Sequence, residues 1–305
     1  MKTKHLLILF SLLVASKTFS QELIHTIDFG NTPYKAKISH DALQVFVAGK
    51  DSTATVWTIE GKRILKLTGH ESSVSSVHYY DSTKTILTGA YDNKAILWDM
   101  NGDILSRFNG HTNGVINITQ NGPFIGTASR DKTAKVWHRD GSLKFTLDDH
   151  KEQVNSIEFI PQEKRILTSS WDGSLKLWDY NGKLIKTIIG HREGIRTAAI
   201  SIKKNRILAG HRDGKISIFD LNGNKIRILN AHSDMVSAII FIENDNIFIS
   251  CGADKLIKVW KHSGELISSF QGHQSWVSSI SYAKGILVTA GDHPENNVKI
   301  WKLKL

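Results

Sequence analysis

The feature that most constrains this chain is a repeat. Seven aromatic residues, each closing a short β-rich run, recur at intervals of 39 or 41 residues: Trp57, Trp98, Trp137, Trp178, Phe219, Trp260 and Trp301. Such a regular period indicates that one supersecondary unit is copied. A unit of this size cannot bury its own apolar face, so the copies must pack on one another. The sequence therefore predicts one domain of stacked repeats.

Further columns around the aromatics define the strands of each repeat. Six positions before the aromatic stands an aspartate: Asp51, Asp92, Asp131, Asp172, Asp213 and Asp254. Three or four positions after it comes a turn dipeptide such as Asn101-Gly102, whose positive φ angles suit a tight hairpin between antiparallel strands. Four β-rich segments per period, repeated seven times, predict an all-β fold. We expect a seven-bladed β-propeller with four-stranded antiparallel blades.

The two ends of the repeat region are complementary. Residues 22–28 resemble the outer-strand segment at residues 183–188, but three strands of their own do not precede them. Residues 276–303 supply three strands and lack a fourth. We expect the N-terminal strand to complete the last blade, which closes the ring and hides strand edges.

The first twenty residues have a different composition. Lys2, Lys4 and His5 precede an apolar stretch from Leu6 to Ala15 that is too short to span a bilayer. This pattern predicts a secretory signal peptide over residues 1–20, cleaved before Gln21, and a propeller domain over residues 21–305. We therefore expect an exported protein, in the bacterial periplasm or outside the cell, with no stable membrane anchor.

Charge and cysteine content narrow the function classes. The formal net charge of +10 favours acidic partners or anionic glycans. Lysine and arginine are nevertheless not gathered into blocks. No nucleic-acid recognition motif is present, so we expect no nucleic-acid partner. The single cysteine, Cys251, lies in a predicted strand and is expected to be a buried small residue, with no internal disulfide.

A histidine column completes the repeat and carries a family resemblance. It comprises His70, His111, His150, His191, His232 and His273, usually preceded by glycine. The resulting Gly-His … Asp-x5-Trp pattern resembles the WD-repeat (WD40) family from about residue 22 to Leu305. The resemblance implies a hydrogen-bonded tetrad in each blade, in which histidine, strand hydroxyl, tryptophan and aspartate satisfy one another's buried polar groups.

Four repeats contain the whole tetrad. They are His70, Thr88, Asp92 and Trp98; His111, Thr127, Asp131 and Trp137; His150, Thr168, Asp172 and Trp178; and His232, Ser250, Asp254 and Trp260. Repeat five has Phe219 and Ala209, so a donor and its acceptor are lost together, and repeat one has Gly30 and Val47 at the histidine and hydroxyl positions. In repeat seven Asp292 is the expected acid, at the start of a longer turn. Because these residues recur in separate blades, we expect them to be structural.

Other columns are candidates for binding. The resemblance implies that the residue before each turn aspartate, and residues around the first apolar position of each inner strand, reach the top face of the ring. The first column reads Lys50, Tyr91, Arg130, Trp171, Arg212 and Ala253; the second reads Lys35, Ser75, Ile116, Asn155, Arg196, Ser237 and Ser278, with Met235 and Trp276 two positions earlier. Arginine and aromatic residues dominate protein interfaces because they combine apolar contact with directional polar groups.

The predicted function is non-catalytic binding. We expect a monomeric scaffold that holds an acidic or extended segment of a partner protein on its top face, with no cofactor and no metal. The sequence has no glycine-rich phosphate loop, G-x-S-x-G elbow or paired cysteines, which disfavours an enzyme. Two alternatives remain open at this level: an envelope glycan- or polymer-binding module, and a propeller enzyme with its ligands at the channel mouth. The arginine and aromatic side chains could also simply shield the channel.

Overall fold

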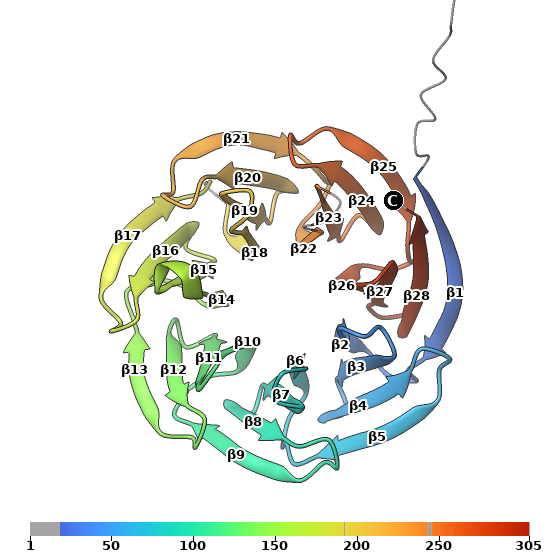
Figure 1. Cartoon of the computed structure of the whole chain (residues 1–305), viewed down its shortest axis with the longest axis horizontal. Coiled ribbons are helices and arrows are strands. Elements are labelled where there is room, and N and C mark those ends of the chain that lie inside the picture. Colours follow the sequence, from blue (N-terminus) through green and yellow to red (C-terminus); the bar gives the residue numbers. More distant parts are fainter. Residues whose placement is uncertain (1–18, 192, 243, 245, 305) are drawn as a thin grey trace, which may run out of the picture.

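The molecule is a closed ring of seven four-stranded antiparallel sheets around a central channel (Figure 1). The computed structural model describes residues 19–191, 193–242, 244 and 246–304. The predicted all-β, seven-bladed propeller is thereby confirmed. In the described part of the chain, no helix is long and apolar enough to cross a membrane.

Each blade runs from an innermost strand at the channel to an outermost strand at the rim. Blade one contains β2 (Pro33–Ile38), β3 (Gln44–Gly49), β4 (Thr53–Thr58) and β5 (Arg63–Thr68). Blade two contains β6 (Val74–Tyr80), β7 (Thr85–Ala90), β8 (Lys94–Trp98) and β9 (Ile104–Asn109). Blade three contains β10 (Val115–Asn121), β11 (Phe124–Ser129), β12 (Ala134–His138) and β13 (Leu143–Leu147). Blade four contains β14 (Val154–Ile160), β15 (Arg165–Ser170), β16 (Ser174–Asp179) and β17 (Leu184–Ile189), with a short 3-10 helix, Pro161–Glu163, between its first two strands.

The remaining blades follow the same order. Blade five contains β18 (Ile195–Ser201), β19 (Arg206–His211), β20 (Lys215–Phe219) and β21 (Lys225–Asn230). Blade six contains β22 (Val236–Ile242), β23 (Ile247–Gly252), β24 (Leu256–Lys261) and β25 (Leu266–Gln271). Blade seven contains β26 (Val277–Ala283), β27 (Ile286–Gly291), β28 (Asn297–Lys304) and, as its outermost strand, β1 (Ser20–Asp28).

Ring closure joins the two ends of the chain. β1 pairs antiparallel with β28, from Ser20 opposite Lys304 to Asp28 opposite Asn297, and Figure 1 shows the two strands side by side. This confirms that the N-terminal strand completes the last blade. The predicted cleavage point before Gln21 falls inside β1, and the rest of the predicted signal peptide, residues 1–18, lies outside the described residues.

The apolar core lies between blades. Among the described residues there are seven buried clusters, and each joins one neighbouring pair of blades. Between blades one and two, for example, Phe46 stacks on Tyr79 with ring centroids 4.7 Å apart, and Trp98 is buried in the same cluster. The strand faces that a single blade would expose to water are therefore covered by the next blade, as expected for repeats.

A β-bulge occurs at the same place in all seven blades. Each innermost strand shifts register against its neighbour near its first residue, for example between Val74 and Ser76 and between Ile195 and Thr197. The residues left without a partner are Tyr34, Ser75, Ile116, Asn155, Arg196, Ser237 and Ser278. All seven line the channel. A bulge re-aims a side chain out of the normal strand alternation, so this repeated irregularity determines which residues face the channel.

Two isoleucines on β1 test how much closure contributes to stability. Ile27 is 2% exposed in the cluster between blades seven and one, whereas Ile24 is 48% exposed. We expect Ile27→Ala to lower the free energy of unfolding by about 2–5 kcal/mol, because it leaves a cavity at the seam. Ile24→Ala should cost under about 0.5 kcal/mol. Urea denaturation of both variants measures this, and equal small losses would contradict a stabilising role for the seam.

Candidate binding site at the channel mouth

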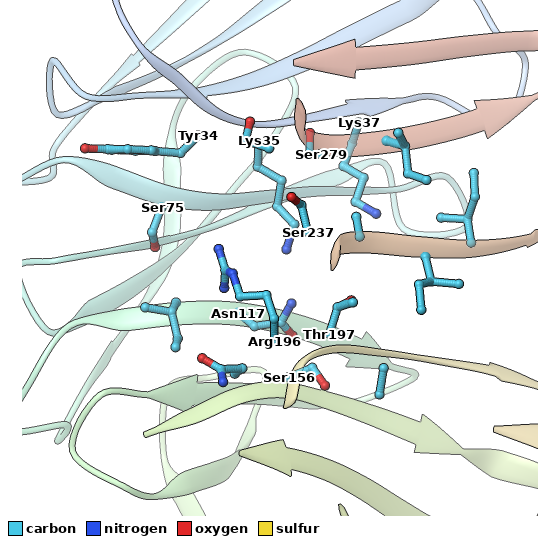
Figure 2. A pocket seen from close by; sticks show the side chains of 18 of the residues that line it. Tyr34, Lys35, Lys37, Ser75, Asn117, Ser156, Arg196, Thr197, Ser237 and Ser279 are labelled. Carbon is cyan, nitrogen blue, oxygen red and sulfur yellow. The ribbon is translucent and has the colours of Figure 1, made fainter. Parts of the chain in front are cut away.

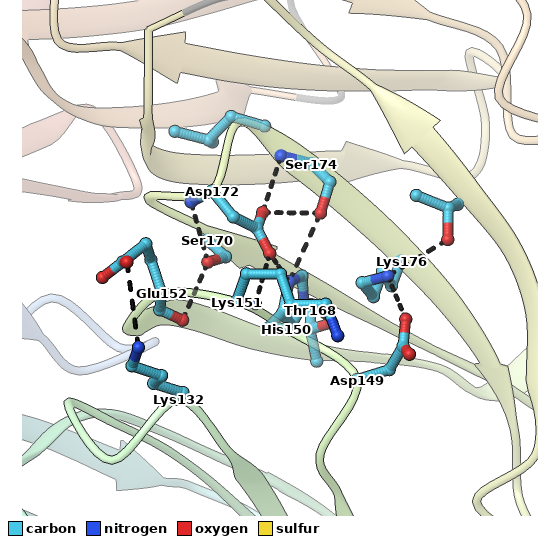
Figure 3. Close-up of polar contacts among 12 residues, drawn as sticks. Lys132, Asp149, His150, Lys151, Glu152, Thr168, Ser170, Asp172, Ser174 and Lys176 are labelled. Atoms are coloured by element: carbon cyan, nitrogen blue, oxygen red, sulfur yellow. Dashed lines mark hydrogen bonds and ion pairs between the residues drawn. The ribbon is translucent and has the colours of Figure 1, made fainter.

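A complete tetrad occupies blade four, and Figure 3 shows three of its members, His150, Thr168 and Asp172. The Trp178 indole N–H donates to Thr168 Oγ1 at 2.9 Å, and His150 Nε2 lies 2.8 Å from the same oxygen. His150 Nδ1 lies 2.8 Å from an oxygen of Asp172. Because an indole N–H can only donate and a carboxylate can only accept, the hydroxyl donates to Nε2 and Nδ1–H donates to Asp172. Asp172 also accepts from the Ser174 hydroxyl at 2.6 Å.

The same bonds, at 2.7–2.9 Å, join the corresponding residues of three other blades. The sets are His70, Thr88, Asp92 and Trp98; His111, Thr127, Asp131 and Trp137; and His232, Ser250, Asp254 and Trp260. Each set lies within one blade, with its histidine, hydroxyl and tryptophan buried. In the part of the chain that the structure describes, no group of three or more His, Cys, Asp or Glu side chains is placed to hold a metal ion.

Blade seven differs from the sequence expectation. His273 Nε2 pairs with Thr289 at 2.7 Å, but Nδ1 lies 3.0 Å from Glu295, so Asp292 is not the acid of this tetrad. The longer turn moves the acidic position three residues along the chain. The Asp292 backbone N–H donates to the Trp276 carbonyl at 2.9 Å, as the residue before the turn aspartate does in other blades. Asp292 thus belongs to the column that faces the channel mouth.

The two degenerate blades find other partners for their polar groups. In blade one the Trp57 indole donates to Thr55 Oγ1 of its own strand at 2.7 Å. In blade five Phe219 and Ala209 need no partner, while the buried His211 pairs with Ser217 Oγ at 2.8 Å. Burial lowers the pKa of His211 to about 4, so this ring is neutral near pH 7.

The binding columns meet at one mouth of the channel, in a depression of about 410 Å³. Ten of the fifteen predicted candidates line it: Ser75, Tyr91, Ile116, Arg130, Trp171, Arg196, Arg212, Met235, Trp276 and Ser278. Backbone bonds position the column before the turn acids, such as Arg130 N–H to the Gly114 carbonyl at 3.0 Å. At Gly194 a Cβ would lie 2.9 Å from Trp171 Cα, so only glycine permits the close approach that holds Trp171 in place.

Arginine and aromatic side chains are paired in this mouth. The Arg130 guanidinium lies 4.2 Å from the Tyr91 ring centroid, and that of Arg212 lies 4.9 Å from Trp171. Such cation–π contacts hold the side chains in place while the charges stay available, since Arg130 and Arg212 are exposed and Trp171 is 37% exposed. The Trp276 indole is oriented by donation to Ser237 Oγ.

Five predicted candidates lie elsewhere. Ala253 lines neither the mouth nor the channel, whereas Ser237 lines the channel. Lys50 is exposed but lines neither the mouth nor the channel. Lys35 and Asn155 lie deeper, in a channel cavity of about 110 Å³. The inner-strand column of blade one is one residue off in the sequence prediction, because the bulge residue is Tyr34 and not Lys35.

Sequence reasoning also missed residues of the mouth. Tyr34, Gln153 and Asp292 line it, in addition to the predicted set. Gln153 immediately precedes its inner strand, as Met235 and Trp276 do, so that column carried a usable signal. The sequence pattern did not identify Tyr34 because the bulge in β2 shifts the channel-facing position by one residue. It did not identify Asp292 because the longer turn of blade seven shifts the position that precedes the turn acid.

Together, the fold and the mouth define a β-propeller with a depression lined by arginine and aromatic side chains at one end of its channel. The model of the WD domain, G-beta repeat, matches six segments: residues 61–99, 102–138, 141–179, 182–220, 223–261 and 264–302. The chain therefore belongs to the WD40 repeat family, and the resemblance seen in the sequence is confirmed.

Relatives and a solved structure agree with this assignment. The chain is 36% identical over 109 residues to eukaryotic translation initiation factor 3 subunit I of Eremothecium gossypii, covering 34% of this chain and 31% of that protein. It is 26% identical over 137 residues to the ribosome biogenesis protein WDR12 homolog of Drosophila persimilis, covering 36% and 33%. The match thus spans about a third of each of these relatives. The crystal structure of the WD40 beta propeller domain of Doa1 superposes with a TM-score of 0.83 at 25% identity, covering 92% of this chain and 97% of that chain.

These relatives contradict the predicted localisation. They are eukaryotic proteins named for translation initiation and ribosome biogenesis, which take place inside cells, so the expectation of an exported periplasmic or extracellular protein is wrong. The signal peptide over residues 1–20 itself stays a prediction, because residues 1–18 lie outside the described residues. The alternative of an envelope glycan-binding module depended on export and is dropped with it. The relatives' names fit a protein-interaction scaffold.

The Glu295 carboxylate in the blade-seven tetrad predicts a pH dependence of folding stability. Burial alone would raise the pKa of Glu295, but hydrogen bonds from Lys299 and the Gln274 backbone, with the nearby His273 ring, outweigh it and lower the pKa to about 2. A carboxyl with a lowered pKa stabilises the folded chain above its ordinary pKa, and this stability is lost as the pH falls toward 2. We expect Glu295→Gln to lower the free energy of unfolding by about 1–3 kcal/mol at pH 7 and by progressively less toward pH 2.

The matched control is Glu265→Gln, which breaks an exposed pair with Lys261 on a hairpin. That substitution should change stability little at any pH, because exposed ion pairs contribute at most about 1 kcal/mol. Urea denaturation between pH 2 and pH 7 measures both variants. A Glu295→Gln loss that does not change with pH would contradict the tetrad role of this carboxylate.

Proposed function

We propose that this protein is a non-catalytic interaction scaffold that holds an acidic, extended segment of a partner protein across the channel mouth. The observation that carries the proposal is the pairing of exposed arginines with aromatic rings in a single depression. Membership of the WD40 family and the relatives' names support a role in protein assemblies. We propose that the protein acts as a monomer, with one propeller per functional unit.

The charge of the mouth supports an acidic segment. Arg130, Arg196 and Arg212 line it against one carboxylate, Asp292. Guanidinium groups form paired hydrogen bonds with carboxylates, which adds geometric selectivity to charge attraction. A negatively charged segment would also be steered to this face, because complementary potentials raise association rates.

The shape of the mouth supports an extended segment. The aromatic rings of Tyr91, Trp171 and Trp276 come from blades two, four and seven, so they are spread around the ring. A single compact side chain cannot contact all three. A segment that crosses the mouth can place successive residues on them, and such aromatic anchors supply most of the binding energy in many interfaces.

Substitutions at the mouth test this proposal. We expect Trp171→Ala and Arg212→Ala each to weaken capture of the partner by at least about tenfold, since loss of an interface anchor costs about 2 kcal/mol or more. The measurement is affinity capture from native lysate by the wild type, with mass spectrometric identification of the captured protein. Titration calorimetry of the purified pair follows. Because Trp171 and Arg212 lie outside the seven core clusters, thermal unfolding should change little.

The matched control is Arg139→Ala. Arg139 lies in the turn between β12 and β13, outside the mouth. This variant should capture the partner as the wild type does. Undiminished capture by both mouth variants would overturn the proposal and leave the arginines and aromatics as a cover for the channel.

A further inference from the structure

Behind the mouth the channel contains a second and smaller space, a cavity of about 110 Å³. The two spaces share Tyr34, Ser75, Ile116, Arg196 and Ser278, all of them bulge residues, so the cavity opens to the mouth. It has room for a compact solute with some water, but not for a folded segment. A small solute can therefore enter where a polypeptide chain cannot.

The cavity carries an excess of positive charge. Lys35 and Lys37 reach it from β2 and Arg196 from β18, whereas the carboxylate that lines it is Glu158 on β14. Figure 2 shows the ends of Lys35 and Arg196 pointing into the same open space from opposite walls. Like charges enclosed at close range repel strongly, because surrounding protein screens them less than bulk water does.

These cations have few partners of their own. Lys35 Nζ donates to Ser76 Oγ at 3.3 Å. Among the described residues, neither Lys37 Nζ nor the Arg196 guanidinium makes a hydrogen bond or an ion pair. Their donors are thus available to a solute in the cavity.

One neutral side chain of the cavity, Asn117, adds a further hydrogen-bond donor. Asn117 Oδ1 accepts from the Ile157 backbone N–H at 3.3 Å, so the amide NH2 of Asn117 is turned to the other side. Among the described residues this NH2 has no partner. In contrast, the Asn155 amide NH2 already donates to the Ile195 carbonyl at 2.6 Å. Two kinds of cation and an amide therefore converge on one space.

We propose that the channel cavity binds one small dianionic oxyanion of the sulfate or phosphate class. The forked guanidinium of Arg196, the Lys35 ammonium and the Asn117 amide can donate to several oxygens of one tetrahedral group. The net positive charge excludes metal cations. The cavity shares Arg196 with the mouth, but oxyanion binding there needs no partner protein and does not rest on the partner-binding role proposed above.

The charge state of Lys35 sets the pH dependence. Burial, together with the charges of Lys37 and Arg196, lowers the pKa of Lys35 to about 7, and Glu158 only partly opposes this shift. His78 on β6 also faces this group of charges. Burial lowers the pKa of His78 to about 3, so His78 stays neutral near pH 7. Oxyanion binding needs the protonated Lys35, so affinity should fall as the pH rises through 7.

The test is calorimetric titration of inorganic sulfate into the purified protein in chloride buffer. Sulfate is the probe because its charge does not change between about pH 6 and pH 8. We expect one saturable site, with binding weakened at least about tenfold by Arg196→Gln and by Lys35→Met, as each removes a charge-assisted hydrogen bond. The control Arg212→Gln removes the same charge from the mouth and should leave the sulfate affinity within about twofold.

The outcomes separate the possibilities. Absence of saturable sulfate binding to the wild type, or equal affinity in all variants, overturns the proposal. So does a loss in Arg212→Gln as large as that in Arg196→Gln, because it would place the anion at the mouth. Circular dichroism checks folding, and if Lys35→Met does not fold, Arg196→Gln decides. No partner protein is present, so the result does not depend on the proposed scaffold function.

Discussion

The whole structure depends on the fact that no blade can bury its own apolar faces. Each of the seven buried clusters is shared by two neighbouring blades, so stability comes from a closed cycle of contacts and not from any one sheet. The pairing of β1 with β28 makes that cycle continuous. The tetrads serve the same end, because they supply partners to polar groups that blade packing removes from water. Blade five supports this role, because Phe219 and Ala209 replace the tryptophan donor and its hydroxyl acceptor together, and no buried polar group of that pair is left without a partner.

A rigid ring of this kind leaves certain positions free to vary, and these form the candidate sites. The bulge in each innermost strand turns one side chain toward the channel, and the turn column places another at the mouth. Neither position belongs to the buried apolar clusters between blades, so Ser75, Ile116 and Arg196 can occupy equivalent places. The scaffold repeats while the chemistry of the channel does not. The mouth and the cavity are both lined by residues at these variable positions.

Much of the fold could be predicted from the sequence, because its signals are local and repeated. The period, the turn dipeptides and the correlated loss at Phe219 all lie within one repeat. The errors arose where geometry departs from the repeat: a longer turn made Glu295 the partner of His273, and a bulge put Tyr34 where Lys35 was expected. The cavity was not foreseen because Lys37, Glu158 and Arg196 come from three distant strands, and a single sequence gives no sign of their convergence.

The most direct test of the central claim, that the non-repeating mouth holds a partner segment, is site-specific photo-crosslinking. A photoreactive amino acid at position 91 lies in the mouth, and one at position 226 lies on the exposed outer strand β21. The account predicts that the partner is crosslinked from position 91 and not from position 226, and that the crosslinked peptide is acidic. Crosslinking from position 226 with none from position 91 would contradict it.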